Sequence, residues 1–146
     1  WAAASMRASG VVSDMLNPVD PGPAVVACST CRRLGQDPAG PRDGARLIAV
    51  LERVQASDPV YAGIAVQAMP CLFACSEGCT VHLRAPGKIG YVLGRFEPDE
   101  DAARAILDYA VHHAASAEGR VPFSDWPQGV KGHFIVRVPP AGYIAQ

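Results

Sequence analysis

The sequence lacks the charge excess and the long apolar segments that would assign it to two large classes of protein. Thirteen basic and 14 acidic residues leave a net charge of −1, so no overall basic surface indicates a nucleic acid partner. No segment approaches the roughly 18 consecutive apolar residues of a membrane span. The first residues also lack the charged and apolar regions of a signal peptide. We therefore expect a cytoplasmic protein with neither a membrane segment nor a nucleic acid partner.

Several catalytic motifs are missing as well. The chain has no glycine-rich phosphate loop, no Ser/His/Asp set and no evident pair of acid and base residues. These absences argue against a hydrolase, and we expect a carrier or binding protein rather than an enzyme. Hydrophobic residues make up 49% of the sequence and charged residues 18%, which is typical of a compact globular domain. A chain of 146 residues is long enough for one such domain with its own core.

What the sequence does contain is five cysteines in two clusters, each directly after a short apolar run. The first cluster follows the run 24–27 and the second follows the run that ends at Met69-Pro70. The members are Cys28 and Cys31 in the first cluster, and Cys71, Cys75 and Cys79 in the second. The odd count and the tight Cys-x2-Cys and Cys-x3-Cys spacings favour metal or redox chemistry over a secreted disulfide framework. We expect the fold to bring both clusters together around one metal centre.

Hydrophobic periodicity predicts the element order β-α-β-β-β-α. A buried strand at 24–27 precedes a helix that Asp43 caps and Ser57-Asp58-Pro59 ends. A strand at 61–69, a β-hairpin with strands at 80–84 and 89–93, and a second helix follow. This second helix begins in the acidic run 97–101, whose charges suit a helix N-terminus or a basic redox partner, and it ends near Gly119. The order predicts a small two-layer α/β fold.

Three regions are expected along the chain. Residues 1–23 mix small, polar and proline residues and are predicted to form a flexible N-terminal arm. Residues 24–119 would form the metal-binding or cluster-binding domain, and residues 120–146 a C-terminal extension that packs on it. In this extension, Phe134–Val138 is predicted to be an edge strand and Trp126 to pack the tail over the core.

A few polar residues lie near the cysteines or on the second helix, and not all of them are expected to serve the site. Arg32 and Arg33 either offset the charge of thiolate ligands or form a solvated surface pair. His82 lies an odd number of positions from Cys79 along a strand and is expected to point to the opposite face. His112-His113 are expected to be solvated on the polar side of the second helix.

The cysteines suit a metal centre because thiolates are preferred ligands of zinc, copper(I) and iron–sulfur clusters. A Cys-x2-Cys turn places two sulfurs on one side of a backbone loop, which is half of a site. Two such halves supply four ligands, enough for a structural zinc or for a [2Fe–2S] cluster. Spacing alone does not choose the metal, and four-coordination leaves one of the five cysteines over.

Two resemblances bear on that choice. From Cys71 onward the chain contains, in order, Cys71-x3-Cys75-x2-Gly78, an apolar strand, Pro86-Gly87-Lys88, an aromatic-bearing strand and the acidic helix start Glu97-Pro98-Asp99-Glu100. This series resembles the thioredoxin-like [2Fe–2S] ferredoxins. More closely, the span from Cys28 to Pro140 is similar to a bacterial family of predicted metal-binding proteins of unknown function, the DUF1636-like proteins. Its marks here are Cys28-Ser-Thr-Cys31-Arg32, Cys71-x3-Cys75-x2-Gly78-Cys79-Thr80-Val81, Gly119-Arg-Val-Pro122 and Arg137-Val-Pro-Pro140.

The resemblance to the ferredoxins implies a thioredoxin-like fold with a cluster at one end of the sheet. Cys28 matches their first ligand, and Cys71 and Cys75 match their second pair. Those ferredoxins carry the remaining ligand across a loop after the first, whereas the loop 36–43 of this chain has no cysteine. Cys31 is the nearest substitute, so the implied ligand set is Cys28, Cys31, Cys71 and Cys75. Cys79 is the reserve ligand, and the choice between Cys31 and Cys79 stays open.

The function expected from these features is that of a small [2Fe–2S] ferredoxin-like protein that carries single electrons to or from a redox partner protein. A module that binds or delivers zinc or another thiophilic metal is the alternative. A third reading is a thiol oxidoreductase that uses Cys28 and Cys31, although two arginines follow Cys31 and the usual Trp-Cys-Gly-Pro-Cys context is missing. Pairing into a homodimer also stays open, since related thioredoxin-like ferredoxins pair.

Overall fold

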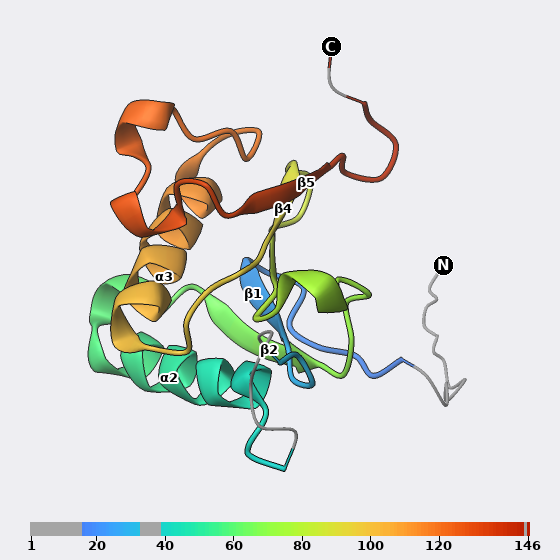
Figure 1. Cartoon of the computed structure of the whole chain (residues 1–146). Coiled ribbons are helices and arrows are strands. Elements are labelled where there is room, and N and C mark those ends of the chain that lie inside the picture. The colour runs from blue at the N-terminus through green and yellow to red at the C-terminus, as the bar shows by residue number, and fades with distance from the viewer. Residues whose placement is uncertain (1–15, 33–38, 145) are drawn as a thin grey trace.

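The computed structural model describes residues 16–32, 39–144 and 146, which form a five-stranded sheet covered on one face by two long helices (Figure 1). Residues 1–15 of the predicted arm 1–23 and Arg33 lie outside the described residues. The main elements are β1 (Ala24–Cys28), α2 (Asp43–Ser57), β2 (Ala65–Met69), β3 (Val81–Arg84), β4 (Gly90–Leu93), α3 (Glu100–Ala115) and β5 (Phe134–Val138).

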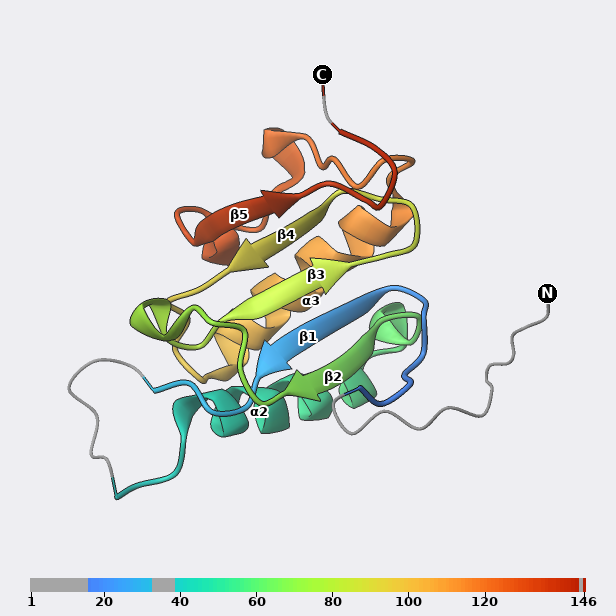
Figure 2. The same cartoon turned by 90° about the vertical axis from the view of Figure 1, so that its right-hand side faces the viewer.

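The sheet is mixed, with the strand order β2-β1-β3-β4-β5. β1 and β2 are parallel neighbours joined by the crossover helix α2, and every other pairing is antiparallel. In Figure 2 the sheet is seen face-on with α2 and α3 behind it. This confirms the predicted α/β class. Within the described residues, none of the helices combines the length and apolar character needed to cross a bilayer.

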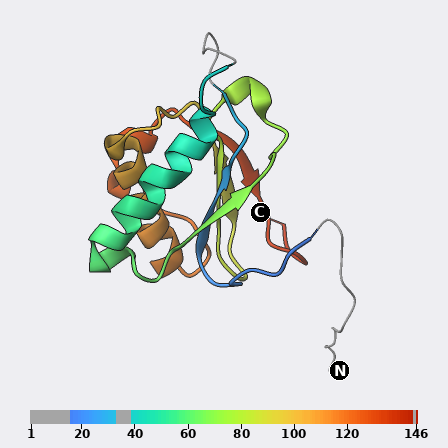
Figure 3. The ribbon, with the colours of Figure 1, turned by 90° about the horizontal axis from the view of Figure 1, so that it is seen from below.

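The core lies between the sheet and the two helices, which both pack on the same face (Figure 3). The predicted stripes are confirmed, because Leu47, Leu51 and Val54 of α2 are buried, as are Ile106 and Leu107 of α3. They meet the alternate strand residues whose side chains point to this face. Those residues are Val25, Ala27, Val81, Leu83 and Leu93.

The two helices begin differently. Asp99 caps α3 by accepting a hydrogen bond from the Ala102 N–H at 2.8 Å, and Glu100 pairs with Arg104 one turn on. The acidic run therefore complements the start of a helix. In α2 the expected cap was wrong: Arg42 occupies the N-cap position and Asp43 is already in the first turn. The Asp43 carboxylate instead accepts from Arg46 at 3.1 Å.

β2 is shorter than expected. The strand was expected at 61–69, but Tyr61 belongs to a 3-10 turn at Pro59–Tyr61. Asp58 caps this turn by accepting a hydrogen bond from the Val60 N–H at 3.1 Å. Proline at the first position favours such a turn over a strand. The Tyr61 ring is buried and its hydroxyl donates to Asp108 of α3 at 2.6 Å, so tertiary packing stabilises the turn.

The C-terminal segment supplies the fifth strand. β5 pairs with β4 at the edge of the sheet, as expected. Trp126 stacks on Phe134 with ring centroids 4.5 Å apart, and its indole N–H donates to the Val121 carbonyl at 2.9 Å, which confirms that it packs the tail over the core.

His113 of α3 is a correction to the expectation from the sequence. Its side chain is 2% exposed, and its Nε2 lies 2.6 Å from the Ile89 carbonyl oxygen. The ring also packs near those of Tyr91 and Tyr109. His112 is exposed as predicted. The two histidines differ because the C-terminal segment and the β3–β4 turn cover the side of α3 that carries His113.

Candidate metal centre

The two cysteine clusters begin at the same edge of the sheet. Cys28 is the last residue of β1 and pairs in register with Met69, the last residue of the parallel strand β2. The Ser29 N–H donates to the Met69 carbonyl at 2.9 Å, which holds the two chain exits together. Loops that leave the carboxyl ends of neighbouring parallel strands are the usual place for a site in an α/β sheet.

The Cys28 sulfur faces the segment that leads into Cys71. Its side chain is 1% exposed, and the sulfur lies 3.8 Å from the Pro70 carbonyl oxygen and 3.7 Å from the Thr30 hydroxyl. The Thr30 hydroxyl also donates to the Pro70 carbonyl. The turn that carries Cys28 is therefore in direct contact with the residue immediately before Cys71.

Cys31 lies beside Cys28 in the same turn and is 4% exposed. Its sulfur is 3.9 Å from the Thr80 hydroxyl, which in turn donates to the Ala74 carbonyl at 3.4 Å. Thr80 thus connects the first turn to the loop between Cys71 and Cys75. Thr30 and Thr80 were missed as site residues from sequence, although Thr30 directly precedes Cys31 and Thr80 directly follows Cys79.

The two neighbouring thiols have opposite pKa shifts. Burial, and after it the adjacent Cys28, raise the pKa of Cys31 to about 11. Burial also opposes ionisation of Cys28, but hydrogen bonds from the Cys31 thiol, from Thr30 and from the Leu72 backbone outweigh it and lower the pKa of Cys28. Cys28 is therefore the thiol of this pair that ionises first.

The N-terminus of α2 packs tightly on the Cys28–Cys31 turn. The Gly44 N–H donates to the Cys31 carbonyl at 3.0 Å. A Cβ atom added at Gly44 would lie 2.0 Å from the Cys28 carbonyl oxygen, so only glycine permits this approach. The guanidinium of Arg42 donates to the Thr30 carbonyl at 3.1 Å. Arg32, expected near the thiolates, donates to the Gly40 carbonyl at 2.9 Å.

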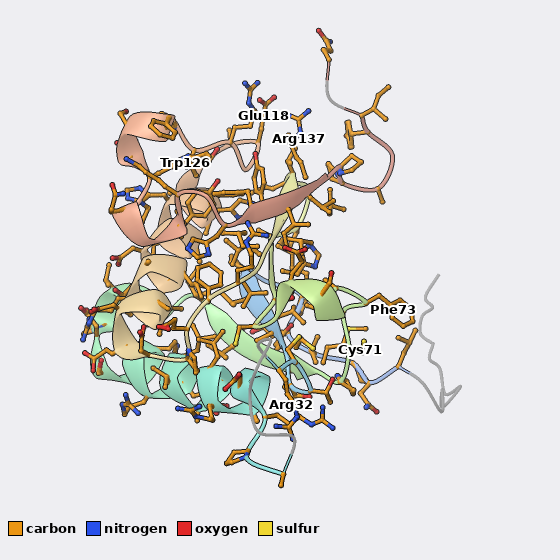
Figure 4. The ribbon with its side chains drawn as sticks, in the orientation of Figure 1. Arg32, Cys71, Phe73, Glu118, Trp126 and Arg137 are labelled. Atoms are coloured by element: carbon orange, nitrogen blue, oxygen red, sulfur yellow. The ribbon has the colours of Figure 1, made fainter. Side chains whose placement is uncertain are left out.

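Cys71 lies on a more open loop. It is partly exposed, and its sulfur accepts a hydrogen bond from the Phe73 N–H at 3.2 Å. Phe73 has a φ of 57° and is 97% exposed, and Figure 4 shows its ring beside Cys71, directed away from the sheet. Backbone N–H donors of this kind tune thiolate ligands in metal sites.

The predicted ligand set is only partly visible. The backbone of Cys75 opens a 3-10 turn at Cys75–Glu77, but its side chain lies outside the described part. Among the side chains that are described, no three of histidine, cysteine, aspartate or glutamate lie close enough to hold a metal ion. The set of Cys28, Cys31, Cys71 and Cys75 thus stays a prediction.

Cys79, the reserve ligand, has different surroundings. It is fully buried, has a φ of 41°, and belongs to the apolar core between sheet and helices. Cys28 and Cys31 are buried outside that core cluster. His82, the next candidate along the strand, pairs with Val26 of β1 and Val92 of β4 and is half-buried, which lowers its pKa.

The structure is similar to that of a thioredoxin-like [2Fe–2S] ferredoxin from Aquifex aeolicus, with a TM-score of 0.51. The alignment covers 86% of this chain and 100% of that protein at 19% sequence identity. The likeness identifies the fold as that of the thioredoxin-like ferredoxins.

The sequence itself identifies the family. Residues 25–140 match the family described as protein of unknown function DUF1636, and the chain belongs to that family. A comparison with curated proteins found no match. The family span begins inside β1 and ends after β5, so it includes both cysteine clusters and the C-terminal strand.

Proposed function

We propose that this protein is an electron carrier that holds a [2Fe–2S] cluster through Cys28, Cys31, Cys71 and Cys75. The observation that carries the proposal is the contact between the two cysteine turns, in which the Cys28 sulfur lies 3.8 Å from the Pro70 carbonyl oxygen. The ferredoxin-like fold supports it. When bound, such a cluster supplies reversible one-electron oxidation and reduction.

The donor chemistry of the described residues fits this group. Three free thiols, those of Cys28, Cys31 and Cys71, lie on the two turns, and soft sulfur ligands suit iron–sulfur clusters. The Phe73 and Leu72 backbone N–H groups face the sulfurs of Cys71 and Cys28 and would stabilise their negative charge. The burial of Cys28 and Cys31 keeps water from their sulfurs.

Phe73 is the proposed contact for a redox partner. An aromatic ring that is 97% exposed contributes nothing to the core, and its positive φ is a conformation that bulky residues rarely adopt. It lies two residues after Cys71, the only partly exposed cysteine among those whose side chains are described. Exposed aromatic residues are frequent anchors in protein interfaces, so a partner that docks here would lie next to the cluster.

The experiment that tests this function is anaerobic purification followed by visible spectroscopy. A [2Fe–2S] protein is coloured, partly bleaches when dithionite is added, and then gives an electron paramagnetic resonance signal. We expect all three results. A colourless protein that contains zinc would instead favour the metal-delivery alternative.

The second candidate function, a thiol oxidoreductase, is favoured by one observation, the opposite pKa shifts of Cys28 and Cys31. In that reaction the two thiols would form a disulfide while a disulfide of the substrate takes up their two electrons and two protons. The burial of Cys28 argues against it, because the attacking sulfur must reach its substrate. Reversible formation of a Cys28–Cys31 disulfide in metal-free protein, with turnover of a disulfide substrate, would support this alternative.

A further inference from the structure

A second candidate site lies at the opposite end of the sheet from the cysteine turns. A cavity of about 620 Å³ opens there beside the β3–β4 turn, with Ile89 at its wall. Arg120 and Glu118 line it from the segment after α3, and Arg137 lines it from β5. Figure 4 shows Glu118 and Arg137 together at this end, far from Cys71. We call this cavity the Arg120–Arg137 pocket.

The two arginines are unusual in having no internal partner. Among the arginines that the structure describes, only Arg120 and Arg137 have side chains without a hydrogen bond or an ion pair. Both side chains are exposed. The cavity therefore carries two guanidinium groups without a direct partner, and the Glu118 carboxylate lines it as well.

The fold brings together two motifs that are not adjacent in the sequence. Arg120 belongs to Gly119-Arg-Val-Pro122 and Arg137 to Arg137-Val-Pro-Pro140, the two marks of the family resemblance that contain no cysteine. The metal centre gives neither motif a role, because both lie at the other end of the sheet. Their convergence in one cavity gives both a common explanation.

The backbone under Arg120 is fixed in place. Gly119 has a φ of 84°, and a Cβ atom there would lie 2.5 Å from the Ile89 carbonyl oxygen, so the close approach requires glycine. The Ile89 N–H donates to the Glu118 carbonyl at 2.9 Å, and the Ser116 hydroxyl donates to the Arg120 carbonyl at 2.9 Å.

Arg137 is held by a regular element. It lies within β5, in register with Tyr91 of β4. Because both guanidinium groups extend from well-anchored backbone, the pocket is built to present them without first ordering a loop.

We propose that the Arg120–Arg137 pocket binds a small organic anion through a phosphate or carboxylate group. The planar guanidinium fork matches both oxyanions in bidentate fashion. Ile89, Pro140 and Tyr143 supply an apolar wall for the body of the ligand, and Glu118 accepts hydrogen bonds from its hydroxyl or amino groups. The volume lies within the range of about 300–1,000 Å³ typical of small-molecule sites.

The test is calorimetric titration of the full-length protein with two probes, adenosine 5′-monophosphate for the phosphate arm and citrate for the carboxylate arm. We expect at least one probe to bind, with affinity that falls as salt is raised. In the double variant Arg120→Gln/Arg137→Gln, binding should weaken by at least about tenfold, because two charged hydrogen-bonding groups are lost. Arg53→Gln on α2 is the matched control, since it also removes an exposed guanidinium but lies outside the pocket.

Two outcomes would overturn the proposal. One is that neither probe binds at millimolar concentration, and the other is that the double variant binds as tightly as the Arg53→Gln protein. Because both arginines are exposed, circular dichroism should show all variants folded. The result is independent of the cysteine centre, so either proposal can fail without the other.

Discussion

The Cys28 sulfur lies 3.8 Å from the carbonyl oxygen of Pro70, the residue immediately before Cys71. This contact joins two turns that are about forty residues apart in sequence. It follows from the parallel register of β1 and β2, in which Cys28 pairs with Met69. A centre that draws ligands from both turns therefore depends on this pair of strands for its assembly.

Replacing the cysteines one at a time should show which of them are ligands of the metal centre. We expect Cys→Ser changes at Cys28, Cys31, Cys71 and Cys75 to abolish or strongly reduce the visible absorption, because serine oxygen is a poor ligand for a soft metal centre. Cys79→Ala should retain it, since that thiol is buried in the apolar core. The visible spectra of the five purified variants show which cysteines are ligands. If the Cys79 variant lost the visible absorption and the Cys31 variant kept it, Cys79 rather than Cys31 would be the fourth ligand.

Gly44 should be essential to the geometry of the site. In Gly44→Ala the new methyl group would overlap the Cys28 carbonyl oxygen, and the helix would have to move away from the turn. We expect the free energy of unfolding to fall by about 1–3 kcal/mol, the usual effect of overpacking. Denaturant unfolding measures this loss directly.

Gly63→Ala is the matched control, because a Cβ atom there would meet nothing within 4 Å. It should leave stability and absorption nearly unchanged. Equal unfolding midpoints for the two alanine variants would contradict the close packing of α2 on the cysteine turn.

Phe73 should influence electron transfer without influencing the fold. Its ring is 97% exposed, so Phe73→Ala should leave the absorption spectrum and the unfolding midpoint unchanged. With cytochrome c as an artificial acceptor, we expect the rate of electron transfer to fall by about fivefold, since an anchoring aromatic contributes about 1 kcal/mol or more to docking. Stopped-flow mixing of the reduced protein with cytochrome c measures that rate.

Phe123→Ala serves as the comparison, because Phe123 is another exposed aromatic residue on a different segment. It should transfer electrons at the wild-type rate. If both variants reacted equally fast, Phe73 would have no part in docking.

Stability should decrease in mild acid because of His113. Burial lowers the pKa of His113, with Lys88 adding to the effect and the hydrogen bond to the Ile89 carbonyl opposing it. The folded protein thus binds the proton less readily than the unfolded chain, whose histidine has a pKa of about 6.5. His113 therefore stabilises the fold above that pH, and this stability is lost as the pH falls through the lowered pKa.

Thermal unfolding at about pH 7.5 and about pH 5.5, on either side of the ordinary histidine pKa, tests this link. We expect the midpoint of the wild type to fall in acid and that of His113→Gln to fall less. His112→Gln removes an exposed neighbour and should behave like the wild type. An identical pH dependence in the His113 variant would show that other groups cause the acid sensitivity.

The sequence allowed much of the fold to be predicted because its patterns are local. Apolar runs that end at Cys28 and at Met69 indicated two strands, and the spacing of Leu47, Leu51 and Val54 indicated a helix. The element order indicated a two-layer α/β fold, and the resemblance to the ferredoxins implied its thioredoxin-like class, which the structural likeness confirms.

The features that were missed depend on contacts between distant segments. His113 is buried because the β3–β4 turn brings Ile89 to it, and the residues before β2 form a turn because Tyr61 packs on α3. The approach of Thr80 to Cys31 likewise depends on tertiary contacts. Hydrophobic periodicity within one element carries no information about such contacts.

The central claim is that the two cysteine turns hold an iron–sulfur cluster, and elemental analysis tests it most directly. Iron, acid-labile sulfide and zinc should be measured in anaerobically purified protein to which no metal has been added. We expect about two iron atoms and about two sulfides per chain, with little zinc. About one zinc atom per chain without iron or sulfide would contradict the account.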